Sequence, residues 1–307
     1  MPKMQIERSI VIDAPVDKVY NILNDFNQWI VWSPWLIMSP KAKVTVSEDA
    51  KSYEWDGERV GSGSMKILSE DVNKSIDYDL VFLKPWKSQA NVRFILEHEE
   101  DTTKVTWTMD SGLPFFMFFM KKMMEAFVGA DYERGLDMLK AYAENDEVSS
   151  KLDWKGTSSF NGCKYVGIHT QCSLDDVGER MKNDFGKIWE FAGKDEENLD
   201  GDALTIYHKW DLVKNKISYT SAVPVKEVPT DIPSGFTKGE IPATEVYTLE
   251  HTGRYQHLGN AWSTLYAMNR AKEFKTKKGI HPFERYLNNP EDTPEKELIT
   301  QVHFAVK

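Results

Sequence analysis

The feature that most constrains the fold of this chain is an internal repeat in its second half. One copy has apolar patterns typical of a strand, a helix and two further strands at 164–171, 174–193, 204–211 and 216–225. The second copy repeats that order at 244–253, 255–274, 283–289 and 297–306. Each β-α-β-β unit is too small to bury its own faces. We therefore expect the two copies to pack around a pseudo-twofold axis, with a groove between them.

The two copies also align residue by residue at their ends. Tyr207 in the first copy falls where Tyr286 falls in the second, and the ending "VPV" of one copy matches "FAV" of the other. Equivalent positions of a duplicated unit occupy equivalent places in the fold. The two tyrosines are thus predicted to lie symmetrically about the axis.

The first half has a different pattern. "IERSIVI" alternates apolar and polar residues, as a half-buried strand does, and "DAPVDKVYNILND" has helical spacing after a proline. Several strands are then expected, at 43–48, 52–56, 64–70, 75–83, 90–97 and 103–109. Residues 115–146 predict two helical pieces, the second amphipathic through Leu136, Leu139 and Tyr142.

A polar segment separates the halves. The stretch "NDEVSSKLDWKGTSSFNG" at 145–162 has little apolar periodicity and reads as a linker. The length of 307 residues suggests two domains of ordinary size. We expect an α+β chain with domains at 1–148 and 156–307.

Composition and charge exclude several classes of protein. Residues 1–150 hold 17 basic and 25 acidic side chains, and the remainder hold 21 and 23, so neither half is a basic nucleic-acid-binding module. No apolar run is long enough to span a membrane. Two cysteines indicate neither a disulfide scaffold nor a metal-ligand spacing. We expect a cytoplasmic protein without metal or cofactor that does not bind nucleic acid directly. A protein partner and a homo-oligomer are both compatible with the sequence.

The segment "HPFERYLNNP" places a carboxylate among aromatic residues. In a strand, Glu284 and Tyr286 share one face while Phe283 and Arg285 share the other. An ionised carboxylate buried without a partner costs several kcal/mol, so such a group either holds its proton or meets a cation. Aromatic walls around one carboxylate suit a lipophilic cation. The alternative is that Glu284 lies at a strand edge in water.

Other residues are candidates for the walls of the same site. Tyr255 and Trp262 are seven apart, which puts them on one face of a helix. The remaining candidates in this half are Tyr207, Trp210, Tyr247, Trp189 and His208. In the first half, Tyr53 and Trp55 share a strand face, and Trp107 lies on another strand. These rings either line an open cavity or fill the interior, as packed side chains ordinarily do.

The stretch "LPFFMFFMKKMMEAF" at 113–127 is nearly continuous in its apolar character. It is too short to cross a bilayer. We interpret it as a helix and loop that close the first-half cavity or form a self-association surface, with an interfacial membrane helix as the alternative.

The first half resembles the START-like, or SRPBCC, superfamily, especially its polyketide-cyclase-like branch. The resemblance rests on "IDAPVDKVYNILNDFNQWIVWSPW", "YEWDGERVGSGSMKI", "TTKVTWTMD" and "DYERGLDMLKAYAE", and covers nearly all of 4–146. It implies an antiparallel sheet wrapped around a long C-terminal helix. It also implies a cavity between them for apolar small molecules.

The second half resembles the GyrI-like, or bacterial effector-binding, family. The resemblance rests on "EVYTLEHTGRYQHLGNAWSTLY", "PFERYLNNPEDTPEKELITQVHFAV" and "YHKWD", and covers about 160 to the end. It implies a receptor for small molecules, with Glu284 as the pocket glutamate. Such domains are often fused to a DNA-binding module, and here a START-like domain takes that place.

Three functions follow from these expectations. The first is binding of apolar or cationic aromatic small molecules in two cavities, for sensing or detoxification. The second is hydrolysis of strained electrophiles, with Glu284 as general acid or base and Tyr255 as a hydroxyl donor. The third is a regulatory adaptor that senses a ligand and acts on another protein. The residues alone do not decide whether the protein is an enzyme.

Overall fold

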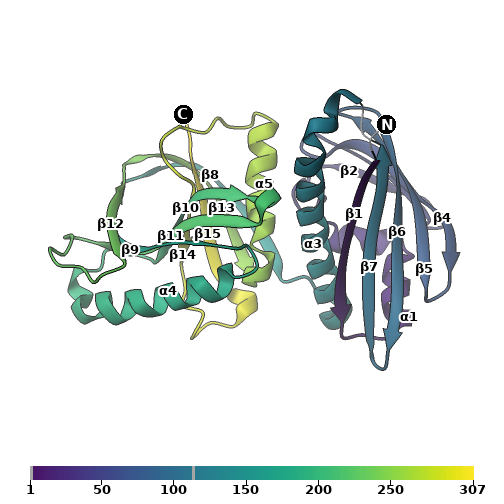
Figure 1. Ribbon diagram of the computed structural model, residues 1–307. Helices are drawn as coiled ribbons and strands as arrows, with labels where there is room; N and C mark the ends of the chain where they lie inside the picture. The colour runs from purple at the N-terminus through teal and green to yellow at the C-terminus, as the bar shows by residue number, and fades with distance from the viewer. Residues whose placement is uncertain (1–2, 113–114) are drawn as a thin grey trace. The chain divides into compact units, whose positions relative to one another are not determined.

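The computed structural model describes residues 3–112 and 115–307. Contacts within the chain divide it into two compact units, Met1–Ser149 and Ser150–Lys307. Each unit has its own antiparallel sheet and its own helices (Figure 1). The expected α+β class with two sheet domains is therefore confirmed.

Unit 1 contains a seven-stranded sheet in the order β1-β7-β6-β5-β4-β3-β2. Its strands are β1 (Lys3–Ile12), β2 (Lys43–Val46), β3 (Ser52–Gly57), β4 (Gly61–Asp71), β5 (Ser75–Lys84), β6 (Ser88–Glu99) and β7 (Thr102–Gly112). All neighbouring strands are antiparallel, so short turns suffice to connect β2 to β7 in sequence. The first strand closes the order by pairing with β7.

Helices cover one face of this sheet. They are α1 (Val16–Leu23), α2 (Phe26–Trp32) and α3 (Lys121–Asn145), with a 3-10 turn, η1 (Phe115–Met120), before α3. The Asp25 side chain accepts the Asn27 N–H and so caps the start of α2. Leu136, Met138 and Leu139 of α3 are buried in the sheet-facing core. Where the sequence predicted two helical pieces, the structure has the 3-10 turn η1 followed by one continuous helix, α3.

The sheet packs around the long helix α3, as the resemblance to the START-like superfamily implies (Figure 1). Of the apolar stretch 113–127, residues 113 and 114 lie outside the described residues. Within the described part, no helix is long and apolar enough to cross a membrane.

Unit 2 contains an eight-stranded sheet in the order β12-β9-β11-β10-β14-β15-β13-β8. Its strands are β8 (Ser150–Phe160), β9 (Cys163–Cys172), β10 (Leu204–Asp211), β11 (Lys216–Val225), β12 (Phe236–Ile241), β13 (Thr244–Gly253), β14 (Phe283–Tyr286) and β15 (Ile299–Ala305). The first repeat supplies β9-β11-β10 and the second supplies β14-β15-β13. The order is a mirror image about the central β10–β14 pair, which is the pseudo-twofold arrangement predicted from the repeat.

Hydrogen bonds at the centre of the sheet show the symmetry directly. The Tyr207 N–H donates to the Pro282 carbonyl, and the Tyr286 N–H donates to the Ala203 carbonyl. These two bonds are equivalent under the twofold. Tyr207 and Tyr286 are therefore equivalent residues, as the sequence alignment of the repeats predicted.

The expected linker at 145–162 is mostly a strand. Residues Ser150–Phe160 form β8, which pairs with β13 along its whole length. The segment looks like a linker because β8 lies at the sheet edge, where alternate residues face water; Leu152 and Trp154 pack on one core cluster and Phe160 packs on another. At the opposite edge, β12 pairs with β9. Each repeat is thus extended by the strand that precedes the other repeat.

Two helices pack on the same face of this sheet. They are α4 (Val177–Ala192) and α5 (Gly259–Arg270). Ile188 of α4 packs on Val166 and Val223, and Leu265 of α5 packs on Leu249 and Val302. Glu284 is paired with Val302 across β14 and β15, so its side chain projects from the same, helix-covered face.

Candidate functional site

The candidate site in unit 2 centres on Glu284. Its strand, β14, is four residues long and lies between β10 and β15 in the middle of the sheet. Glu284 is 1% exposed, so it is not a strand-edge residue in water. Tyr286 lies on the same face, as strand alternation predicts.

Three side chains donate hydrogen bonds to this carboxylate. The Tyr207 hydroxyl donates to Oε2 at 2.8 Å, and the Tyr286 hydroxyl donates to the same oxygen at 2.7 Å. The Trp262 indole N–H donates to Oε1. Both oxygens are therefore occupied by donors from β10, β14 and α5. The sequence identified all three donors as wall residues but did not predict that they bind the carboxylate.

The electrostatics of the site are dominated by burial. Burial raises the pKa of Glu284, and the hydrogen bonds from Tyr286, Trp262 and Tyr207 act in the opposite direction. Burial also raises the pKa values of Tyr207 and Tyr286 well above their usual range, which keeps both hydroxyls protonated as donors. Among the residues that the structure describes, no lysine or arginine forms an ion pair with Glu284. The carboxylate is thus hydrogen-bonded but lacks a counter-charge.

Aromatic rings form the outer layer of the site. Trp210 stacks on Tyr207 at 5.6 Å between ring centroids and meets the edge of Trp262. Tyr255 contacts Tyr286 edge-on, at 5.9 Å. Burial, and then the charge of Glu284, raise the pKa of Tyr255 to about 12. Trp210 and Tyr255 are 39% and 37% exposed, so they reach the surface while Glu284 does not.

Helix α4 supplies residues that the sequence analysis missed. The Tyr286 hydroxyl lies 3.7 Å from the Met181 sulfur, and the Phe185 ring meets Tyr286 edge-on at 5.7 Å. On α5, Tyr266 stacks on Trp262. Met181 and Phe185 are four residues apart on one helix face, so helical spacing would have found them.

Three predicted residues of unit 2 do not join Glu284. Trp189 on α4 is exposed. Tyr247 stacks on Phe274 at 4.9 Å, and no hydrogen bond from it to Glu284 is described. His208 is the extra residue of a β-bulge in β10, and its Nε2 bonds the Thr220 hydroxyl beside His169 on the other face of the sheet.

In unit 1, Tyr53, Trp55 and Trp107 are buried in a cluster of aromatic rings. Tyr53 and Trp55 stack at 5.3 Å, and Trp107 stacks on Tyr132 of α3 at 3.8 Å. The indole N–H groups of Trp29, Trp32 and Trp107 have no hydrogen-bond partner within the described part of the chain. The structure brings Tyr53 and Trp55 together, and it places Trp107 under the long helix.

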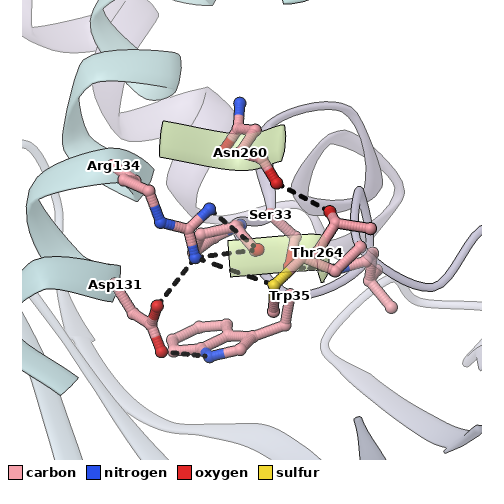
Figure 2. Close-up of polar contacts among 9 residues, drawn as sticks. Ser33, Trp35, Asp131, Arg134, Asn260 and Thr264 are labelled. Carbon is pink, nitrogen blue, oxygen red and sulfur yellow. Dashed lines mark hydrogen bonds and ion pairs between the residues drawn. The ribbon is translucent and has the colours of Figure 1, made fainter. Parts of the chain in front are cut away.

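Trp35, whose ring meets Trp107 edge-on at 5.8 Å, belongs to a polar cluster with Asp131 and Arg134 (Figure 2). The Trp35 indole N–H donates to Asp131 at 3.2 Å, and Arg134 donates to the other carboxylate oxygen of Asp131 at 2.7 Å. Arg134 also bonds the Pro34 carbonyl. The cluster fixes the loop after α2 against α3. Across the described residues, no group of three or more His, Cys, Asp or Glu side chains is arranged to hold a metal ion.

Family comparisons agree with this architecture. Residues 3–144 match the family described as polyketide cyclase / dehydrase and lipid transport, and residues 160–307 match the GyrI-like small molecule binding domain. Both units thus belong to classes of small-molecule-binding domain. The chain is a fusion of a polyketide-cyclase-like domain of the SRPBCC type with a GyrI-like domain.

Three solved structures are each similar to about half of the chain. The EcmrR C-terminal domain is 16% identical, with 52% of this chain and 98% of that chain covered and a TM-score of 0.39. SAV2435 bound to tetraphenylphosphonium is 15% identical, with 50% and 94% covered and a TM-score of 0.39. The Aha1 dimer from Colwellia psychrerythraea is 21% identical, with 46% and 96% covered and a TM-score of 0.35. No curated protein matches the sequence.

Proposed function

We propose that unit 2 binds a lipophilic cation, with Glu284 as its counter-charge and the aromatic residues around it as its walls. The observation that supports this function is a buried carboxylate among aromatic rings with no basic partner in the described part of the chain. An ionised carboxylate without a partner is costly in the interior. A bound cation removes part of this cost, which favours binding of the cation. Aromatic faces add cation–π attraction.

Access to Glu284 requires a movement of the donors. Glu284 is buried beneath Tyr207, Tyr286 and Trp262, so a cation reaches its carboxylate only when one of these side chains moves. Trp210 and Tyr255 are the partly exposed rings next to these donors. We propose that they are the first contacts of the ligand, and that binding therefore changes tryptophan fluorescence.

The test is a titration of wild type and Glu284→Gln with tetraphenylphosphonium and with triphenylphosphine oxide, a neutral compound of related shape. Tetraphenylphosphonium cannot donate a hydrogen bond, so its attraction to Glu284 is Coulombic. At about 5.5 Å and an effective dielectric constant of about 20–40 this attraction is worth about 1.5–3 kcal/mol, so the cation should bind about 10- to 150-fold more weakly to the variant. The neutral compound should be affected much less. Glu190→Gln is the matched control, because it removes the same charge from an exposed position of α4. Equal cation affinity in wild type and Glu284→Gln would refute the proposed site.

Hydrolysis of strained electrophiles is the second candidate, favoured by the raised pKa of Glu284 and the tyrosine hydroxyls beside it. In such a reaction Glu284 takes a proton from water, the water oxygen attacks the ring carbon, and the carbon–heteroatom bond breaks. A tyrosine then protonates the leaving heteroatom. Turnover of a strained epoxide that disappears in Glu284→Gln while binding persists would select this function. Binding alone is favoured because three donors already occupy the carboxylate.

We further propose that ligand binding serves sensing or detoxification in the cytoplasm. Neither unit has a basic surface composition suited to DNA, so any control of transcription would pass through a partner protein. In unit 1, Tyr53, Trp55 and Trp107 are proposed to contact an apolar ligand. The test is a titration of residues 1–149 with an apolar fluorescent probe. If the probe neither binds nor quenches the tryptophan fluorescence, the proposed ligand site of unit 1 is refuted.

A further inference from the structure

A second buried carboxylate lies on the same helix-covered face as Glu284. Asp184 of α4 is 7% exposed. Its Oδ2 accepts the Thr170 hydroxyl at 2.7 Å and the Tyr219 hydroxyl at 3.3 Å. Thr170 and Tyr219 are cross-strand partners on β9 and β11. Asp184 is thus held by tyrosine and threonine hydroxyls much as Glu284 is held by its own donors.

Asp184 also resembles Glu284 in lacking a counter-charge. No lysine or arginine among the described residues forms an ion pair with it, and its Oδ1 has no hydrogen-bond partner in the same set. This oxygen is therefore open to the positive charge of a ligand. Unit 2 thus has two buried acidic groups on one face, and neither forms an ion pair with a described lysine or arginine.

A polar strip connects the two carboxylates along the sheet. Thr205 pairs with Glu284 across β10 and β14, and Ser221 pairs with Thr205 across β11 and β10. Ser221 is fully buried, and its hydroxyl has no hydrogen-bond partner within the described residues. A buried hydroxyl without a partner is costly, so its position here indicates a group that the bound ligand or a bridging water supplies.

We propose that Asp184 is a second anionic subsite and that unit 2 takes elongated dications, with one charge at Glu284 and the other at Asp184. This inference rests on the proposed function of Glu284. Adjacent strands are about 4.8 Å apart, so β11 lies about 10 Å and β9 about 14 Å from β14. The matching ligand class is an aromatic dication with charges on the order of 10–14 Å apart.

The test compares a bis-quinolinium alkane of that spacing with the monocation that carries one quinolinium on the same alkane chain. Asp184→Asn keeps the shape of the side chain and removes its charge. We expect it to weaken binding of the dication about tenfold or more, because one quinolinium charge loses its Coulombic partner, and that of the monocation by less than about twofold. A dication with a spacer half as long should respond like the monocation. Asp184→Glu, which keeps the charge, should retain dication binding better than Asp184→Asn does.

The outcomes separate the two proposals. If Asp184→Asn affects the monocation and the long dication equally, or affects neither, the second subsite is refuted, and Asp184 only joins α4 to the sheet. If Glu284→Gln leaves monocation binding unchanged, the proposed function fails whatever Asp184 does. Undiminished monocation binding by Asp184→Asn also shows that the variant folds. If it does not fold, Asp184→Ser provides a smaller neutral side chain for the same comparison.

Discussion

Thr205 lies directly opposite Glu284 in the central antiparallel pair of β10 and β14. The two are also equivalent positions of the repeat, because each precedes its symmetry-related tyrosine, Tyr207 or Tyr286, by two residues. The pseudo-twofold axis therefore passes between a hydroxyl and a carboxylate. The Tyr286 hydroxyl lies within hydrogen-bond distance of both, at 2.9 Å from Thr205 and 2.7 Å from Glu284. The two repeats are thus symmetric in backbone but not in chemistry, because Glu284 has a carboxyl group where the symmetry-related Thr205 has a hydroxyl.

The pH dependence of stability should report the ionisation of Glu284. Burial raises its folded-state pKa above the ordinary value of 4.5, so the folded state holds a proton that the unfolded state has lost. Its contribution to stability is present at low pH and is lost as the pH rises from about 4.5 through the folded pKa. The Glu284→Gln variant has no carboxyl group here, so its stability should not fall in this way as the pH rises. Urea unfolding of both proteins at several pH values above 4.5 should show the wild type losing stability relative to the variant.

His303 should produce the opposite slope. Burial lowers its pKa from 6.5 to about 3, and its Nδ1 bonds the Thr248 hydroxyl at 2.8 Å. The contribution of its neutral form is complete above pH 6.5 and is lost as the pH falls towards 3, since the unfolded state takes up the proton first. The loss is about 2 kcal/mol by pH 5. His303→Gln should be less acid-sensitive, whereas His281→Gln, at an exposed histidine, should behave as wild type.

Two glycines of α3 offer a matched test of packing in unit 1. A Cβ at Gly135 would lie 2.8 Å from the Trp107 ring and 3.1 Å from the Pro34 ring. At Gly129 it would meet only the end of the Arg8 side chain, which can move. Alanine favours a helix by about 1 kcal/mol over glycine at either site. We expect Gly135→Ala to destabilise by about 1–3 kcal/mol and Gly129→Ala to be neutral or stabilising. Equal melting temperatures for the two variants would contradict this packing.

The start of the second domain can be tested by truncation. Both fragments 1–149 and 150–307 should be soluble and unfold cooperatively. A fragment beginning at residue 156 loses the first half of β8, including Leu152 and Trp154, and uncovers the edge of β13. We expect it to be less stable by about 3 kcal/mol, and to aggregate more readily. If 156–307 is as stable as 150–307, β8 contributes little and the linker interpretation of 145–162 regains support.

The sequence alone determined much of this protein, because the relevant signals are local or repeated. Strand alternation placed Glu284 and Tyr286 on one face, and the alignment of the two repeats made Tyr207 equivalent to Tyr286. The resemblances to known families indicated both folds, and both are confirmed. Such predictions succeed because side-chain direction follows the period of a helix or strand, whatever the rest of the chain does.

Only the tertiary structure decided which distant residues meet. Trp262 and Tyr207 are 22 and 77 residues from Glu284, yet both donate to its carboxylate. The edge strand β8 looked like a linker because its pairing with β13, some ninety residues on, leaves no local pattern. A single bulge between Tyr207 and Lys209 brought Trp210 back to the face of Tyr207, and the packing of α4 buried Asp184. Register and helix packing are non-local, so no window of the sequence contains them.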